Sequence, residues 1–152
     1  MKTALILVDI QNDYFPGGRM ELVGIKEASH KAQQLLSMFR EQQQLTIHVQ
    51  HLFLNDMAGF FIPHTDGIGI HDSITPLPNE VVIQKNYPNS FLHTKLLDKL
   101  NATNVEALVI CGAMSHMCID ATVRAAADFG FKCTLIQDAC ATKDLQFGGK
   151  TI

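Results

Sequence analysis

The stretch VEALVICGAMSHMCIDATVRAAADFG, residues 105–130, has the pattern of a strand, a glycine turn and a helix in succession. Residues 106–111 form an apolar run typical of a buried strand, Gly112 follows as a turn residue, and helical spacing then continues to Gly130. This pattern places Cys118 at the start of a helix, just beyond the carboxyl end of a strand. Unpaired N–H groups and the partial positive charge at a helix N-terminus favour a nucleophilic thiolate. Free cysteines are also among the most buried residues, so the stretch by itself fits an inert core cysteine equally well.

The rest of the chain repeats the alternation of strand and helix. Short apolar runs predict strands at residues 3–8, 45–50, 80–84 and 132–137, and helical spacing predicts helices at 25–39 and 95–100. Such alternation favours βαβ units and a parallel sheet in an α/β domain. Turn residues predict loops at residues 9–18, 51–79 and 138–142. The loop at 51–79 is long for a compact domain, which is typical of a functional segment or a lid.

Composition narrows the class of protein. The chain has 152 residues, of which 47% are hydrophobic and 18% charged, as expected for one soluble domain spanning residues 1–152. A net charge of −3 gives no indication of a nucleic-acid or membrane partner, and no window is long and apolar enough to span a bilayer. No signal peptide is visible, and the four cysteines have no zinc-ribbon spacing, so we expect reduced thiols and a cytoplasmic location.

Three reactive side chains follow three of the predicted strands. Asp9 comes after the first strand, Lys85 after the third and Cys118 shortly after the fourth. Ligands of open parallel α/β sheets bind beyond the carboxyl ends of the strands, so the three side chains can meet there. A carboxylate can act as a general base, an ammonium can hold it ionised, and a thiol can attack an electrophilic carbon. The alternatives are a loop-capping Asp9 and a solvated Lys85, and the co-occurrence of all three favours a catalytic site.

Four segments resemble the motifs of the isochorismatase-like cysteine hydrolases. They are VDIQNDYF at residues 8–15 with Gly17 and Gly18, Lys85 with NSFL at 89–92 and Thr94, GAMSHMCIDATVRAA at 112–126, and DACAT at 138–142. They occur in the family's order and extend from about Thr3 to Asp144. The resemblance implies a Rossmann-like three-layer α/β/α sandwich with a mostly parallel sheet of at least five strands.

The resemblance also implies the roles of individual residues. It implies a catalytic triad of Asp9, Lys85 and Cys118, and a cis peptide between Ala113 and Met114. The backbone N–H groups of Met114 and Cys118 would then form the oxyanion hole. Since true isochorismatases of the family often lack the cysteine, Cys118 favours hydrolysis of a C–N bond, as in the family's amidases.

No metal or other cofactor is implied. Nicotinamidases of the family carry an Asp-x-His metal motif after the second strand, whereas this chain has HVQHLF at residues 48–53, which disfavours that activity. Four histidines do gather in the sequence, and a zinc site is the alternative to consider. His48 and His51 are three apart, which sends their side chains to opposite faces of a strand. The four are His48, His51, His64 and His71.

A pocket for a small-molecule substrate is expected beside Cys118. Apolar walls could come from Phe15, Phe60, Phe61, Tyr87 and Phe91, although each aromatic ring fits the core equally well. We assign the pocket to Phe15, Phe60, Tyr87, Phe91 and His116.

The sequence thus predicts a hydrolase in which Cys118 attacks a small amide, Asp9 protonates the leaving amine, and water resolves a thioester. The alternatives are a non-catalytic binding or scaffold protein of the same fold, a nicotinamidase or isochorismatase activity, and a redox-sensing cysteine, for which no resolving cysteine is evident nearby. Comparable family chains continue with a further helix and strand beyond the point where this chain stops, at Ile152. An uncovered edge strand invites association, so we expect a homo-oligomer.

Overall fold

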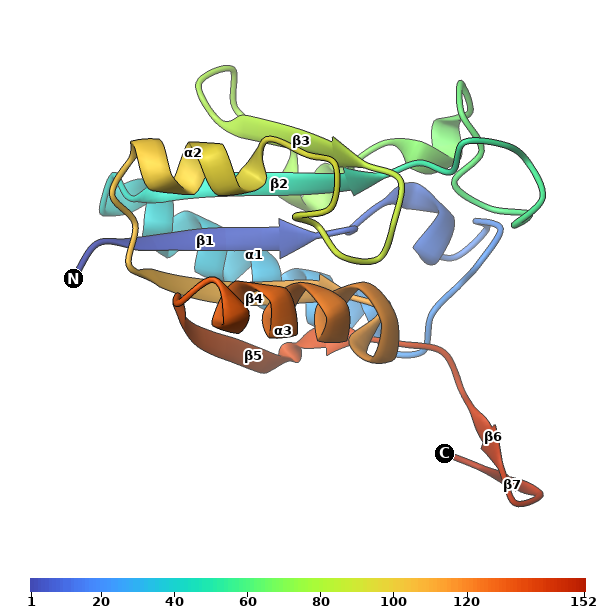
Figure 1. Ribbon diagram of the computed structural model, residues 1–152. Helices are drawn as coiled ribbons and strands as arrows, with labels where there is room; N and C mark the ends of the chain where they lie inside the picture. Colours follow the sequence, from blue (N-terminus) through green and yellow to red (C-terminus); the bar gives the residue numbers. More distant parts are fainter.

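The computed structural model describes all 152 residues, and its centre is a five-stranded sheet between two layers of helices (Figure 1). The strand order is β3-β2-β1-β4-β5, and every neighbouring pair is parallel. The strands are β1 (Thr3–Val8), β2 (Leu45–His51), β3 (Val81–Lys85), β4 (Ala107–Ala113) and β5 (Lys132–Ala141). The three-layer α/β/α fold predicted from the sequence is confirmed. Because the strand order reverses between β1 and β4, the carboxyl ends of these two strands border the expected ligand site.

Helices cover both faces of the sheet. Helix α1 (Ile25–Glu41) lies on one face, and α2 (Leu96–Ala102) and α3 (Asp120–Asp128) lie on the other (Figure 1). The central strand β1 alternates between the two sides: Leu5 and Leu7 pack with α1, and Ile6 packs with α2 and α3. Both faces of β1 are therefore buried, which explains its unbroken apolar run.

Two elements differ from the sequence prediction, and both lie near the carboxyl edge of the sheet. A π-helical turn, Ser115–Ile119, precedes α3, so Cys118 lies in this turn and the α-helix begins two residues later. The loop predicted at 138–142 is largely the second half of β5, which regains pairing with β4 after an irregularity between Ile110 and Gly112. That irregularity is a bulge-like interruption, which a sequence pattern of turn residues does not distinguish from a loop.

The long segment between β2 and β3 folds back toward the carboxyl ends of the strands. It contains two short 3₁₀ helices, Asp66–Ile68 and Asp72–Ile74, and a third, Asn12–Tyr14, lies in the loop after β1. At the other end of the chain, β6 (Gln146–Phe147) and β7 (Lys150–Thr151) form a hairpin that stands away from the body of the molecule (Figure 1). None of the helices has the length and apolar character required to cross a lipid bilayer.

Candidate active site

Asp9 is the first residue after β1 and is completely buried. Its backbone has φ of 54°, in the left-handed region that few residues other than glycine, asparagine and aspartate adopt. Its N–H donates to the carbonyl of Val49 on β2 at 3.0 Å, which fixes the chain at this point. Backbone strain of this kind is concentrated at functional sites, and here it turns a carboxylate toward the switch point of the sheet.

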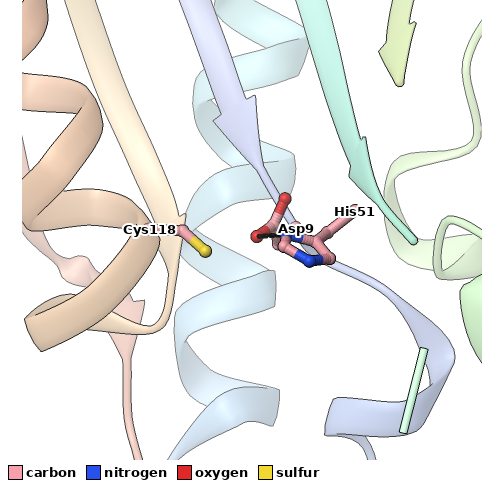
Figure 2. Close-up of side chains that lie close together, drawn as sticks. All are labelled: Asp9, His51 and Cys118. Atoms are coloured by element: carbon pink, nitrogen blue, oxygen red, sulfur yellow. Dashed lines mark ion pairs between the residues drawn. The ribbon is translucent and has the colours of Figure 1, made fainter. Parts of the chain in front are cut away.

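Cys118 is supplied by the π-helical turn that follows β4. The Ala113–Met114 peptide is cis, as predicted, and the carbonyl of Met114 accepts the N–H groups of Met117 and Ile119 at 3.0 and 3.2 Å. The Cys118 side chain is buried and points toward Asp9 (Figure 2). Single π-helical turns of this type are frequent at functional sites.

Lys85 is the last residue of β3, and its side chain has no exposed surface. Its register partner on β2 is His51, which also ends a strand. The Nζ atom has four close neighbours, at 2.6 Å from His51 Nδ1, 3.0 Å from Asp9 Oδ2, 3.0 Å from the Tyr87 carbonyl and 3.2 Å from Cys118 Sγ. The ammonium therefore connects the carboxylate to the thiol, and the structure brings together all three side chains expected at the strand ends.

Charge balance determines how this site is protonated. Burial raises the pKa of Asp9, although the nearby Lys85 ammonium opposes the shift. Burial, and then the Asp9 carboxylate, raise the pKa of the Cys118 thiol, with Lys85 again opposing. A carboxylate and a thiolate side by side would give two buried anions for one cation, so Asp9 and Cys118 share one proton. The thiolate expected from a helix N-terminus is therefore not the resting state, since burial outweighs that effect.

A small cavity lies beside Cys118. Its volume is about 70 Å³, well below the roughly 300–1,000 Å³ of typical ligand pockets. The rings of Phe60 and Phe61 lie 5.0 Å apart, and Tyr14 lies 4.6 Å from Phe61, so aromatic faces form much of the wall. The lining residues are Tyr14, His51, Phe53, Phe60, Phe61, Pro88, Met114, Met117 and Cys118.

Of the five side chains assigned to the pocket from the sequence, only Phe60 lines this cavity. Phe15 is buried in the core on the α1 face and stacks on His71, with ring centroids 3.5 Å apart. Phe91 belongs to the core on the other face. Aromatic rings are suited to both environments, so their residue type does not distinguish pocket from core.

Tyr87 and His116 also lie outside the cavity lining. The Tyr87 carbonyl accepts a hydrogen bond from Lys85, and the residue as a whole is 40% exposed. His116 is exposed and its Nδ1 lies 2.8 Å from the hydroxyl of Thr142. The turn of the nucleophile motif directs Cys118 inward and His116 outward.

Two polar residues, Gln11 and Asp13, hold parts of the site in place, although neither was predicted as a site residue from the sequence. Gln11 is fully buried, and its side chain pairs with both the N–H and the carbonyl of His51, each at 2.8 Å. Asp13 accepts the N–H of Phe61 at 2.7 Å, which anchors the aromatic wall to the loop after β1. Both residues belong to the VDIQNDYF motif, and their polar side chains directly after a buried strand are the signal that could have identified them.

The four histidines considered as metal ligands do not gather. His48 contacts Glu80, at 3.1 Å, His71 contacts Ser73, at 2.9 Å, and only His51 reaches the site. Ligand atoms of Asp9, His51 and Cys118 do lie within 4.8 Å of one another (Figure 2). The Lys85 ammonium contacts all three of these side chains, so a cation already occupies the space between them.

The two motif segments around Lys85 and Cys118 are tied together behind the site. The N–H of Ser90 donates to the Thr122 hydroxyl at 3.1 Å, and the two hydroxyls lie 2.8 Å apart, both fully buried. The hydroxyl of Thr94 donates to the Ser90 carbonyl at 2.6 Å. These contacts fix the segment after β3 against α3, and so set the distance between the lysine and the cysteine.

Known proteins of one family resemble this chain in both sequence and fold. Residues 3–148 match the isochorismatase domain family. An uncharacterized isochorismatase family protein of Bacillus subtilis, YddQ, is 50% identical over the whole chain, which covers 84% of that protein. The streptothricin hydrolase of Streptomyces noursei is 34% identical over 93% of this chain, which spans half of that enzyme. The crystal structure of an isochorismatase hydrolase from Oleispira antarctica superimposes with a TM-score of 0.92 at 46% identity, covering 99% of this chain and 81% of that one.

Proposed function

Because the chain belongs to the isochorismatase family, we propose that it is a cysteine hydrolase that cleaves the C–N bond of a small non-peptide amide through a thioester. The observation that carries this proposal is the position of Lys85 Nζ, 3.0 Å from Asp9 Oδ2 and 3.2 Å from Cys118 Sγ in a buried site. The similarity to streptothricin hydrolase supports hydrolysis as the reaction class.

The first half of the reaction begins with transfer of the Cys118 proton to Asp9. The total charge of the site does not change, because the thiolate replaces the carboxylate as the counterion of Lys85. The thiolate then attacks the carbonyl carbon of the substrate, and the carbonyl oxygen becomes an oxyanion. We assign its stabilisation to the N–H groups of Met114 and Cys118, at the turn between β4 and α3.

Collapse of this intermediate breaks the C–N bond and transfers the proton from Asp9 to the nitrogen, so ammonia or an amine leaves. Asp9, again a carboxylate, then takes a proton from water as the water oxygen attacks the thioester carbon. The carbon–sulfur bond breaks, the sulfur regains the proton held by Asp9, and a carboxylic acid leaves. One amide and one water thus give one acid and one amine.

The raised pKa of Asp9 favours an amide over an ester substrate. An amine is a poor leaving group unless it is protonated, and Asp9 can supply that proton after it has taken it from Cys118, because burial raises the pKa of Asp9 and so favours its protonated form. The small aromatic cavity favours a compact substrate without a peptide chain.

A screen for released ammonia or amine, with small amides, ureas and carbamoyl compounds, tests the proposal. The wild-type protein should release amine from at least one class, and Cys118→Ala should lower turnover by about 10⁴-fold or more. Cys133→Ala is the matched control, because this cysteine is a residue of β5 outside the cavity lining, and it should keep the wild-type rate. Acid quenching during turnover should give an adduct at Cys118 in the mass spectrum.

Turnover by Cys118→Ala at the wild-type rate would show that the thiol is not the nucleophile. Binding of amides without release of amine from any of them would instead support the alternative of a non-catalytic binding protein.

A further inference from the structure

His51 is a buried histidine at the end of β2 that has no role in the reaction proposed above. Its side chain is 3% exposed and lies in the wall of the cavity beside Cys118. Its Nδ1 atom is 2.6 Å from Lys85 Nζ and 3.9 Å from Asp9 Oδ2. The contact with Nζ is the shortest that the ammonium makes, so the imidazole is placed to influence Lys85 directly.

The surroundings hold this imidazole in one position. The side chain of Gln11 bonds both backbone polar groups of His51, and the ring packs against Phe53 and Phe61 with centroids 4.5 and 5.8 Å away. A backbone fixed by two hydrogen bonds and a ring held between aromatic faces leave the imidazole little freedom to turn.

Geometry also fixes the tautomer of the ring. An ammonium has three donors and no acceptor, so His51 Nδ1 must accept from Lys85, and the proton of the neutral ring must be on Nε2. The ring is neutral because burial, and then the charge of Lys85, lower the pKa of His51 to about 3. Nε2 has no partner within the protein.

We propose that His51 is a positioning residue of this active site, whose neutral Nδ1 holds the Lys85 ammonium between Asp9 and Cys118. The catalytic importance of this contact rests on the proposed function, although the contact between His51 Nδ1 and Lys85 Nζ can be tested without a substrate.

The number of hydrogen bonds explains why such a residue is needed. Lys85 has three protons and four neighbouring acceptors, namely His51 Nδ1, Asp9 Oδ2, the Tyr87 carbonyl and Cys118 Sγ. While Cys118 is a thiol, the three protons of Lys85 can be donated to His51 Nδ1, Asp9 Oδ2 and the Tyr87 carbonyl. When the proton of Cys118 moves to Asp9, the new thiolate must accept a hydrogen bond from one of the three N–H groups of Lys85. The fixed imidazole keeps Nζ within 3.2 Å of sulfur, so a donor can turn to the thiolate without displacement of the ammonium.

Substitutions of His51 separate positioning from packing. In His51→Asn, Oδ1 is as many bonds from the backbone as Nδ1 and can accept from Lys85, whereas Gln in His51→Gln carries its amide one bond further out. His51→Leu has no acceptor. His48→Leu is the matched control, a buried histidine of the same strand that contacts Glu80 and not the site.

The readout is the rate at which iodoacetamide alkylates Cys118 as a function of pH, located by mass spectrometry. Because Lys85 lowers the pKa of Cys118, a displaced ammonium should slow alkylation at pH 8 by about tenfold in His51→Leu and His51→Gln. His51→Asn should react within about threefold of the wild type, and His48→Leu should match it. With a substrate, kcat should follow the same order while KM changes less.

The results can overturn the inference in two ways. A merely structural role predicts alkylation of His51→Leu at about the wild-type rate, because leucine fills nearly the same volume as histidine and preserves the packing of the cavity wall. Equal losses in His51→Asn and His51→Leu, with wild-type circular dichroism in both, would also exclude a role for the Nδ1 acceptor. Neither result depends on the identity of the substrate, so failure here is distinguishable from an active Cys118→Ala, which would overturn the proposed function instead.

Nitrogen-15 NMR of the histidine rings supplies an independent measurement. The inference expects a neutral His51 ring with the proton on Nε2 from pH 8 down to about pH 4, facing Lys85, Asp9 and Cys118. Lys85→Met should raise the pKa of His51, since Lys85 lowers it in the wild type. A proton on Nδ1 in the wild-type protein would contradict the inference.

Discussion

At the scale of single residues, the site depends on one proton shared by Asp9 and Cys118 beside one ammonium. Lys85 lies 3.0 Å from the Asp9 carboxylate and 3.2 Å from the sulfur, and all three side chains are buried. A second anion is unfavourable in such a site, so a reactive thiolate forms only as Asp9 is protonated. Slow alkylation of the free protein is therefore expected of a working enzyme.

Asp9→Asn should make Cys118 more reactive toward alkylation while abolishing turnover. Without the carboxylate, the thiolate becomes the only counterion of Lys85, and the pKa of Cys118 should fall because Asp9 raises it in the wild type. Iodoacetamide labelling at pH 7, quantified by mass spectrometry, should be at least tenfold faster in the variant. Cys133 and Cys140 in the same sample serve as internal references, and slower labelling of Cys118 in the variant would contradict this charge balance.

Gly112→Ala should destabilise the protein strongly. Gly112 has φ of 128°, and a Cβ atom at this position would lie 1.9 Å from the carbonyl oxygen of Val8 on β1. Strain and overpacking together cost about 3 kcal/mol or more. Urea unfolding measures the loss, with Gly17→Ala as control, since Gly17 also has a positive φ but has open space around it. Equal losses in the two variants would show that the close approach of β4 to β1 is unimportant.

The sequence was sufficient to locate Asp9, Lys85 and Cys118, because each follows a predicted strand and parallel strands end at one edge. It was not sufficient for the pocket wall. Phe15 and Phe60 look alike in sequence, yet one is in the core and the other beside the thiol. Which aromatic ring lines the cavity depends on how the loops fold over the ends of the strands, and this cannot be predicted from the local sequence around each ring.

At the scale of the elements, the pattern of apolar residues predicted every strand of the central sheet and every α-helix, with ends within a few residues. The errors lie at the π-helical turn Ser115–Ile119 and at the second half of β5. Both depend on pairing with distant residues rather than on local preference, and the irregularity between Ile110 and Gly112 has no sequence signature.

One ion-paired cluster connects α1 and β2 to Glu80, the residue before β3, away from the active site. Arg40 of α1 makes two hydrogen bonds to the carboxylate of Glu80, at 2.7 and 2.8 Å, and His48 of β2 contacts the same carboxylate. Burial favours protonation of Glu80, but hydrogen bonds from Arg40, Leu77 and His48 lower its pKa to about 2 from an ordinary 4.5. This carboxylate therefore stabilises the fold above about pH 4.5, and the stabilisation is lost as pH falls toward 2.

Glu80→Gln should lower the free energy of unfolding by about 1 kcal/mol at pH 7, because solvent around the partly exposed Arg40 screens the ion pair, and the difference from the wild type should shrink below pH 4. Urea unfolding at a series of pH values measures both effects. Asp98→Asn is the control, because the Lys95–Asp98 pair spans 3.9 Å with both side chains largely exposed and should contribute little. A difference for Glu80→Gln that is constant from pH 2 to 7 would contradict the assignment.

At the scale of the whole molecule, the β6–β7 hairpin is separate from the two cores. All four of its strand residues are exposed, and Figure 1 shows it away from the sheet. A two-stranded hairpin without a hydrophobic face to bury is marginally stable in water. Its contribution to the free energy of unfolding is therefore expected to be small.

Removal of residues 144–152 should change the midpoint of thermal unfolding by less than about 2 °C. Hydrogen exchange in the intact chain should be fast at the hairpin amides and slow in β1. A large loss of stability after truncation would show that the hairpin packs on the domain in solution.

The homo-oligomer expected from the sequence stays a prediction. Strand β5 is one edge of the sheet, and most of its residues are exposed or half-buried, so its free edge is where a second copy could pair. Light scattering in solution tests this, and a strictly monomeric protein would contradict it.

The two tyrosines give this site a spectroscopic use. The chain has no tryptophan, and its only tyrosines are Tyr14, whose ring lines the cavity, and Tyr87, whose carbonyl accepts a hydrogen bond from Lys85. The intrinsic fluorescence of the protein thus originates from one ring in the cavity wall and one partly exposed ring outside the cavity lining. A candidate ligand that enters the cavity should alter the emission of Tyr14, and titrations can follow occupancy without a label or a turnover assay.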